Sequence, residues 1–99
     1  MGTDHAEISC ASLLKVLADE TRLAVLRQLL GRAMHVGEIN ESLQLEQSLL
    51  SHHLKVLRDA GLVSAERDGK AVLYSLSPEF RAATKRNTID LGCCLISFD

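Results

Sequence analysis

The stretch that decides the fold runs from residue 36 to residue 61 and has the sequence VGEINESLQLEQSLLSHHLKVLRDAG. Apolar residues recur there at helical spacings of three and four in two successive runs, Val36, Ile39, Leu43 and then Leu50, Leu54, Leu57. The runs predict a short helix and a longer one over about 47–60, joined by a tight connection at residues 44–45. A short helix, a tight turn and a longer helix form a helix-turn-helix, here over about 36–60, whose second helix can lie in the DNA major groove.

The longer helix has two different faces. Its leucines point inward, and the opposite face is polar, mostly near the N-terminus. The polar residues are Gln47, Ser48, Ser51, His52 and Lys55. Side chains of these types hydrogen-bond base edges and phosphates, which favours a recognition helix. A plain amphipathic surface helix has the same pattern, so this helix alone does not decide the function.

A hairpin pattern follows and makes the prediction more specific. Residues 62–67 have the composition of a strand, Asp68 and Gly69 form a hairpin turn signal, and residues 70–76 alternate like a returning strand. A helix-turn-helix followed by such a wing, over about 62–76, is a winged helix-turn-helix. Arg67 and Lys70 flank the tip, where they can touch phosphates or the minor groove, although a solvated turn has the same composition. We therefore expect a mainly α fold with a two-stranded β-hairpin wing.

Further helices are expected on both sides of this unit. Leu13 and Leu17 belong to a first helix over about 7–18, and Asp19 is a good N-cap for a second helix. Ser77 and Pro78 form a helix-start signal, which predicts a last helix over about 78–94 with Gly92 as its weak point or end.

Length and composition limit the function. The 99 residues allow one domain, 1–99, and 46% apolar with 24% charged residues is typical of a globular protein. The net charge of −2 argues against a protein that coats nucleic acid but not against a sequence-specific binder. Such a small core favours a homodimer, which we expect to close through Leu13, Leu17, Leu91 and their neighbours.

Several other classes of protein are disfavoured. The sequence shows no nucleophile–base motif, glycine-rich phosphate loop or paired-carboxylate spacing, so we do not expect an enzyme. No secretory signal opens the chain, and its uncharged apolar runs are far shorter than the roughly 20 residues that span a bilayer. We therefore expect a cytoplasmic protein without a membrane partner.

Three segments resemble one known family. Residues 48–63 (SLLSHHLKVLRDAGLV) are similar to the recognition-helix signature of the ArsR/SmtB family of small metal-responsive repressors. Residues 17–23 (LADETRL) resemble the entry to that family's second helix, and RDGK at 67–70 with YSL at 74–76 resembles its wing. The resemblance covers about residues 10–78. It implies a homodimer, closed by the first and last helices, that binds an inverted-repeat DNA operator and releases it when an inducer binds.

The sequence departs from this family's pattern in two ways. Glu46 stands where members often place Ser or Thr as the N-cap, and its carboxylate suits the helix dipole but repels a nearby phosphate. The best-known effector sites of the family are also missing. There is no Cys-x-Cys in the third helix, where residues 35–39 are HVGEI, and no Asp/His set in the last helix, which disfavours the zinc type of site.

Cys10, Cys93 and Cys94 remain as candidate effector ligands. Three thiolates make a soft site suited to trivalent arsenic or antimony, or to another thiophilic metal, and we expect no obligatory cofactor. Some family members resemble this chain in carrying paired cysteines in the last helix as an arsenite site.

Other roles for the cysteines stay open. Cys10 is also consistent with a small buried apolar residue, and a redox or reactive-sulfur sensor would use the same cysteines. Such a sensor favours pairing Cys10 with Cys93 or Cys94, because adjacent Cα atoms lie only about 3.8 Å apart, below the usual disulfide range of roughly 4.4–6.8 Å. In a reducing compartment we expect free thiols or ligands rather than a structural disulfide. A winged helix used only for protein interaction is the third hypothesis.

Overall fold

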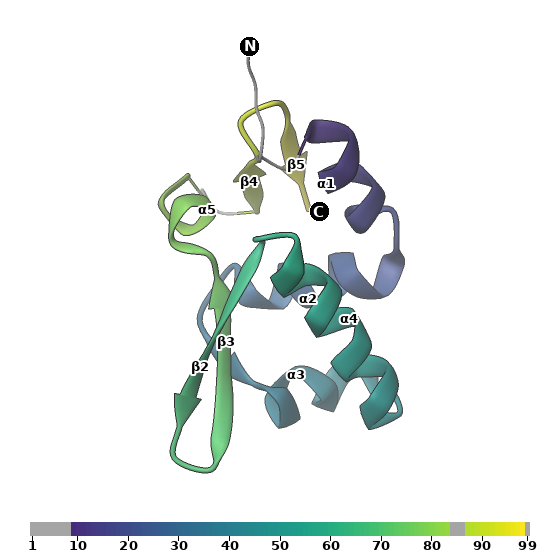
Figure 1. Ribbon diagram of the computed structural model, residues 1–99, viewed down its shortest axis with the longest axis vertical. Helices are drawn as coiled ribbons and strands as arrows, with labels where there is room; N and C mark the ends of the chain where they lie inside the picture. Colours follow the sequence, from purple (N-terminus) through teal and green to yellow (C-terminus); the bar gives the residue numbers. More distant parts are fainter. Residues whose placement is uncertain (1–8, 84–86, 99) are drawn as a thin grey trace.

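The structure is a computed structural model that describes the backbone of residues 9–83 and 87–98 (Figure 1). The helices are α1 (Cys10–Leu17), α2 (Glu20–Leu29), α3 (Val36–Leu43), α4 (Gln47–Asp59) and α5 (Pro78–Ala83). The strands are β1 (Met34–His35), β2 (Val63–Asp68), β3 (Ala71–Leu76), β4 (Thr88–Asp90) and β5 (Leu95–Ser97). The expected order of four helices, a hairpin and a further helix start is confirmed over the described residues.

Side-chain caps start the first two helices. The Ser9 hydroxyl accepts the main-chain N–H of Ser12 at the start of α1, over 3.2 Å. Asp19, the predicted N-cap of α2, accepts the main-chain N–H of Arg22 over 3.0 Å. That hydrogen bond is the main reason why the pKa of the Asp19 carboxyl lies below its usual value.

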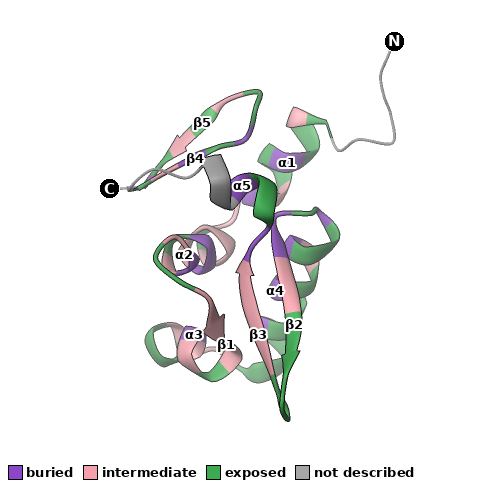
Figure 2. Cartoon of the chain, turned by 90° about the vertical axis from the view of Figure 1, so that its left-hand side faces the viewer, coloured by how far each residue is buried: buried purple, intermediate pink, exposed green. Residues whose placement is uncertain are grey.

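The core lies between helices α1 to α4, the upper half of the wing and β4 (Figure 2). It is built almost entirely from aliphatic side chains, as the low aromatic content requires. The most deeply buried are Val25, Leu26, Ile39, Leu50, Leu54, Leu57, Leu62 and Ile89. The helical spacing of the leucines therefore identified the inward face of α4 correctly.

The wing is the hairpin β2–β3, and β1 extends it to a three-stranded antiparallel sheet with the strand order β1-β3-β2, one strand more than expected. Asp68 pairs with Ala71 at the tip, which leaves a two-residue connection of Gly69 and Lys70. Gly69 has φ of +65°, which glycine adopts without steric cost and which suits a tight hairpin. Strand β1 pairs Met34 with Tyr74, so the segment that leads into the helix-turn-helix is hydrogen-bonded to the middle of β3.

The predicted last helix over about 78–94 is wrong. Helix α5 ends at Ala83, and Thr88 to Ser97 form the antiparallel pair β4–β5, in which Ile89 pairs with Ile96. Three local features explain the difference. The strands contain the β-branched residues Thr88, Ile89 and Ile96. Gly92 has φ of +93°, and the Asp90 carboxylate accepts the main-chain N–H of Gly92 over 2.8 Å. Each of them favours a hairpin over a continuing helix.

Some predicted positions cannot be compared. Residues 7 and 8 of the expected first helix, and residues 84–86 of the expected last helix, lie outside the described residues. Within the described residues, no helix is long and apolar enough to cross a membrane.

Candidate DNA-binding surface and cysteine cluster

The turn between α3 and α4 is held by one side chain. Asn40 donates its amide to the carbonyl of Leu45 over 2.9 Å and accepts the main-chain N–H of Leu45 over 2.8 Å. Gln44 between them adopts the left-handed conformation, with φ of +52°. These constraints set the direction in which α4 leaves the turn, and so the direction of its polar face.

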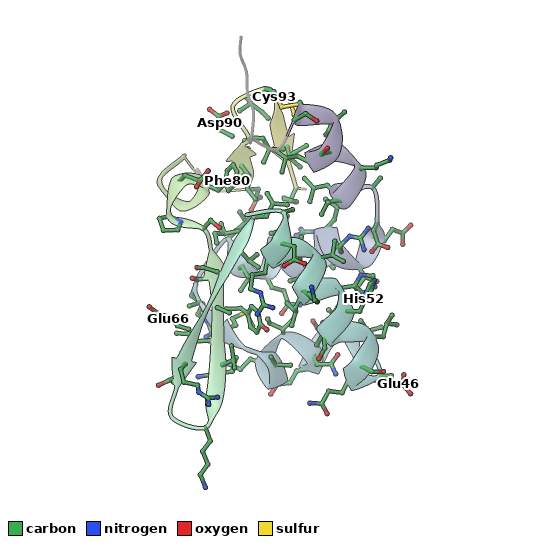
Figure 3. The ribbon with its side chains drawn as sticks, in the orientation of Figure 1. Glu46, His52, Glu66, Phe80, Asp90 and Cys93 are labelled. Atoms are coloured by element: carbon green, nitrogen blue, oxygen red, sulfur yellow. A yellow bond between two sulfur atoms is a disulfide. The ribbon has the colours of Figure 1, made fainter. Side chains whose placement is uncertain are left out.

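The structure places the five predicted recognition residues of α4 on the exposed face of the helix. These residues are Gln47, Ser48, Ser51, His52 and Lys55. Figure 3 shows His52 projecting away from the body of the molecule, with Glu46 at the start of the helix. Two of them already have partners: Ser48 donates its hydroxyl to Glu46 Oε1 over 2.9 Å, and Lys55 Nζ lies 2.8 Å from Asp59 Oδ2. Leu49, on the same helix, is also exposed and was not predicted.

The wing carries the other two predicted DNA contacts. Arg67 near the end of β2 and Lys70 in the connection are both exposed, on the arm that projects from the body in Figure 1. The arm is tied to the start of α3 by His35, whose Nε2 lies 2.8 Å from Asp68 Oδ2. The Nδ1 atom of His35 lies 3.4 Å from Glu38 Oε1. These two carboxylates, Asp68 above all, raise the pKa of His35 above its usual value.

A buried histidine lies behind the polar face. His53 is 8% exposed, and Arg22 Nη1 lies 3.1 Å from its Nδ1. Because a guanidinium only donates, Nδ1 of His53 is the acceptor in this contact. This contact between His53 and Arg22 was not predicted from the sequence. A side chain of α2 that reaches α4 leaves no pattern in the local sequence.

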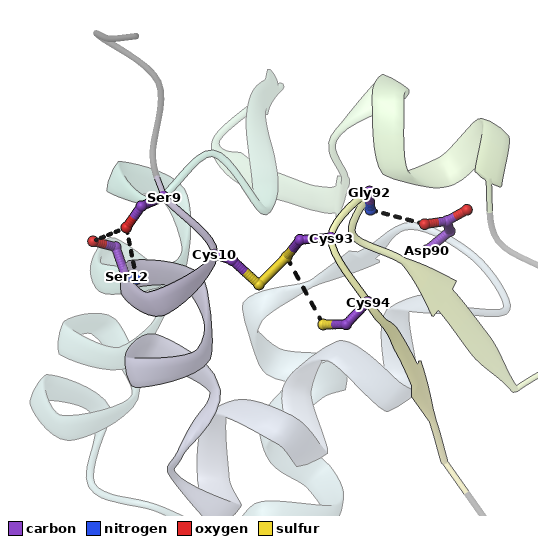
Figure 4. Close-up of a disulfide and its surroundings, with 7 residues drawn as sticks. All are labelled: Ser9, Cys10, Ser12, Asp90, Gly92, Cys93 and Cys94. Carbon is purple, nitrogen blue, oxygen red and sulfur yellow. Dashed lines mark hydrogen bonds between the residues drawn. A yellow bond between two sulfur atoms is a disulfide. The ribbon is translucent and has the colours of Figure 1, made fainter. Parts of the chain in front are cut away.

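The three cysteines meet in one cluster (Figure 4). A disulfide joins Cys10 of α1 to Cys93 in the loop between β4 and β5, with their Cα atoms 6.0 Å apart. Cys94 is a free thiol whose Sγ lies 3.9 Å from that of Cys93. All three sulfur atoms lie within 4.8 Å of one another.

This arrangement corrects two expectations. The cysteines are not all free thiols, because Cys10 and Cys93 are bonded, in the kind of pairing that the redox hypothesis favours. Cys93 and Cys94 lie in a hairpin loop and not in a last helix. The hairpin brings them to the start of α1 within a single chain, so assembling the cluster does not require a second subunit.

The cluster and the start of α4 lie far apart. Figure 3 places Cys93 at one end of the long axis of the molecule and Glu46 toward the other. Any influence of the sulfur atoms on the polar face must therefore pass through the helices between them.

Comparison with known proteins agrees with this architecture. Residues 19–65 match the family described as bacterial regulatory protein, arsR family. The transcriptional regulator NmtR of Mycobacterium tuberculosis is 42% identical over 72 residues, which are 73% of this chain and 60% of NmtR. The arsenical resistance operon repressor of Staphylococcus xylosus is 35% identical over 88 residues, which are 84% of this chain and 85% of that repressor.

A solved structure shows the same fold. The crystal structure of Mycobacterium tuberculosis Rv0081 is similar with a TM-score of 0.68 and 42% identity, over 73% of each chain. The chain spans 60% of the length of NmtR and 60% of that of the Vibrio cholerae activator HlyU. These relatives are named as transcription regulators and not as enzymes. The winged helix-turn-helix, the sequence match over residues 19–65 and the similarity to the repressor of Staphylococcus xylosus show that this chain belongs to the arsR family of bacterial regulatory proteins.

Proposed function

We propose that the chain is a cytoplasmic, homodimeric transcriptional repressor, which binds an inverted-repeat DNA operator and is released by trivalent arsenic or antimony. The observation that carries this proposal is the placement of two groups in one chain. An exposed polar face of α4 and a wing tip that carries Arg67 and Lys70 offer DNA contacts, and three sulfur atoms gather at the far end of the molecule. The similarity to an arsenical resistance operon repressor supports the choice of inducer.

The DNA contacts divide by chemistry. Gln47, Ser51 and His52 offer hydrogen bonds to base edges, and Ser48 to a base or a phosphate, whereas Lys55, Arg67 and Lys70 supply positive charge for phosphates. Losing a base contact costs about 1–3 kcal/mol and relaxes specificity, whereas losing a phosphate contact weakens all sequences and flattens the salt dependence.

The DNA proposal is tested by operator binding at several salt concentrations. We expect Ser51→Ala combined with His52→Ala to lower affinity for the operator more than for unrelated DNA. Lys70→Gln is the matched control and should lower both affinities together. If the double alanine variant binds the operator as tightly as the unchanged protein does, α4 is not the recognition helix.

Arsenic binding requires the reduced cluster. A dithiol reductant supplies two electrons and two protons to the Cys10–Cys93 bond, and two thiols result. Three thiols then replace the three hydroxyl groups of arsenous acid, which forms three As–S bonds and releases three water molecules. Three soft sulfur ligands in one place bind trivalent arsenic more favourably than they bind harder metal ions.

The inducer is tested by titrating arsenite or antimonite into the reduced protein on its upstream DNA. We expect DNA release, and no release in the variant that combines Cys93→Ser with Cys94→Ser. Cys10→Ser tests whether the third sulfur belongs to the chain or is supplied by a small thiol. Normal release from the double variant would place the inducer site elsewhere.

A redox or reactive-sulfur sensor is the second candidate function, and the Cys10–Cys93 disulfide favours it. Formation of that bond removes two electrons and two protons from the two thiols. An oxidant such as a peroxide accepts these electrons and protons. Cys94→Ser separates the two functions, since it keeps both cysteines of the disulfide but removes one arsenic ligand. Release of DNA from this variant by peroxide, but not by arsenite, is expected if both chemistries operate. Release of the unchanged protein by peroxide alone would favour the redox sensor.

A further inference from the structure

We propose that Arg22 is the positioning residue that transmits the state of the cysteine cluster to α4, through the Val16 carbonyl on one side and His53 on the other. This inference rests on the proposed function and deepens it, because it names the connection between the sensing and the DNA-binding ends of the molecule.

The first observation is that one side chain joins three helices. Arg22 lies in the first turn of α2, where its own main-chain N–H is held by Asp19 over 3.0 Å. Its Nε donates to the carbonyl oxygen of Val16 in α1 over 2.6 Å. Its Nη1 donates to Nδ1 of His53 in α4 over 3.1 Å.

The second observation concerns the end of the connection that faces the sulfur atoms. Helix α1 begins at Cys10, which carries the disulfide, and is only eight residues long. Val16 lies six residues further on, roughly 9 Å along the helix axis. A helix this short moves as a unit, so a shift of Cys10 also moves the Val16 carbonyl. This carbonyl belongs to the last turn of α1, whose carbonyl groups lack helical donors and carry the negative end of the helix dipole. The Arg22 guanidinium supplies a hydrogen-bond donor and a positive charge there.

The third observation concerns the end that faces DNA. His53 is buried, and it follows Ser51 and His52, which both lie on the exposed face. The rings of His52 and His53 are 5.7 Å apart. The His53 ring is therefore attached to the same part of α4 that carries the proposed base contacts, and a force on this buried ring acts on that part of the helix.

The chemistry of the guanidinium makes the connection sensitive to position. Its donors lie in one rigid plane, so Nε and Nη1 cannot each follow a partner that moves independently. If α1 shifts, Arg22 either moves with the Val16 carbonyl, and then pulls His53 or leaves its buried Nδ1 without a donor, or stays on His53 and loses the Val16 carbonyl. A lysine at this position would have one ammonium group for two acceptors and would follow only one of them.

The first test needs no DNA. Nitrogen-15 NMR of the His53 imidazole is recorded for the disulfide form and for the form reduced with dithiothreitol. We expect the Nδ1 signal to differ between the two forms, and the difference to fall by at least half in Arg22→Lys. Arg27→Lys, the same change at an exposed position of α2, is the matched control and should keep the full difference. A His53 signal that ignores the state of the cysteines overturns the proposal.

The second test measures regulation. We measure the operator affinity of the reduced protein without and with arsenite, or before and after oxidation, and take the ratio of the two values. This ratio is compared between two substitutions of His53. His53→Asn keeps an acceptor close to the Nδ1 position, whereas His53→Leu removes it. We expect the ratio to fall at least threefold in His53→Leu and in Arg22→Lys, and to be largely retained in His53→Asn. A purely structural role would lower thermal stability in His53→Leu and leave the ratio unchanged, which would overturn the proposal.

The two tests distinguish this inference from the proposed function. If the unchanged protein does not bind or release DNA, the proposed function fails, while the His53 signal still reports whether Arg22 transmits the state of the cluster. If DNA release is normal but neither the NMR difference nor the affinity ratio depends on Arg22, only the inference fails.

Discussion

At the scale of single residues, Glu46 stands at the N-cap of α4 without making a side-chain cap. Its carboxylate accepts the Ser48 hydroxyl instead, and it lies at the end of the helix that faces DNA in the proposed function. We expect Glu46→Ser to raise stability by about 1 kcal/mol, since serine caps the exposed main-chain donors. It should also tighten DNA binding, because a negative charge near the phosphates is removed. Urea unfolding and operator titration measure the two effects, and Glu41→Ser, at an exposed position of α3, serves as a control for the loss of charge.

Lys55, a proposed DNA contact, is held by an ion pair within its own helix when DNA is absent. Its ammonium is paired with Asp59 one turn further along α4, and this hydrogen bond is the main reason why the pKa of Asp59 is low. Both side chains are well exposed, so solvent screens the pair and it contributes little to stability. We expect Asp59→Asn to leave stability nearly unchanged and to lower the Kd for DNA by up to roughly fivefold, about 1 kcal/mol. An unchanged Kd would mean that Lys55 does not reach a phosphate.

At the scale of elements, the wing depends on the protonation of His35. Its pKa is raised in the folded protein, chiefly by the hydrogen bond to Asp68, so the protonated form is favoured by folding. The stabilisation is therefore fully present below the unfolded pKa of about 6.5 and is lost as pH rises through the higher folded value. We expect unfolding free energy to fall between pH 6 and pH 8 by more than it does in His35→Gln. Identical pH profiles for the two proteins would show that the ion pair contributes nothing in solution.

The hairpin β4–β5 is the element that assembles the sulfur cluster. Its loop holds Gly92 at φ of +93°, a conformation that other residues adopt only with strain. We expect Gly92→Ala to destabilise the protein by about 1 kcal/mol and to slow formation of the Cys10–Cys93 bond, because the loop no longer presents Cys93 in place. Thermal unfolding and the rate of thiol loss under oxidation measure these effects. Gly31→Ala, where a Cβ meets no atom within 4 Å and φ is not positive, is the control.

At the scale of the whole molecule, the disulfide links positions 83 residues apart in the sequence. Closing so long a loop restricts the unfolded chain, and the chain-entropy model gives about 4–5 kcal/mol as the gain. We expect reduction, or Cys10→Ser, to lower the free energy of unfolding by several kcal/mol, whereas Cys94→Ser should leave it unchanged in the oxidised protein. Denaturant unfolding with and without dithiothreitol measures this difference. Equal stability of the oxidised and reduced forms would contradict it.

The homodimer stays a prediction, but its expected contacts change. Leu13, Leu17 and Leu91 are buried inside the chain and are not free for a second copy. Leu14 of α1 and Leu95 of β5 are exposed, at 43% and 64%, on elements close to the cysteine cluster. We expect sedimentation at micromolar concentration to show a dimer that Leu14→Glu weakens, because a charge would then enter an apolar contact. Leu49→Glu, an equally apolar exposed position on α4, should leave the dimer intact, and a folded monomer of the unchanged protein would contradict the prediction.

The sequence by itself determined the helix-turn-helix and the wing, for a physical reason. The leucine spacing of α4, the Asp19 cap and the turn at Gly69 all act over a few neighbouring residues, so local pattern and local structure agree. The same spacing also identified which side of α4 is exposed, and with it the candidate DNA contacts.

Only the tertiary structure decided how distant parts meet. The sequence pattern of residues 78–94 favoured a helix, whereas the strand pairing of Thr88 to Ser97 and the turn at Gly92 give a hairpin. Cys10 and Cys93 lie 83 positions apart, and Arg22 reaches His53 across 31 positions. Contacts over such separations depend on how the helices pack around the shared core, because side chains from different elements are brought together only when those elements bury their apolar faces against one another.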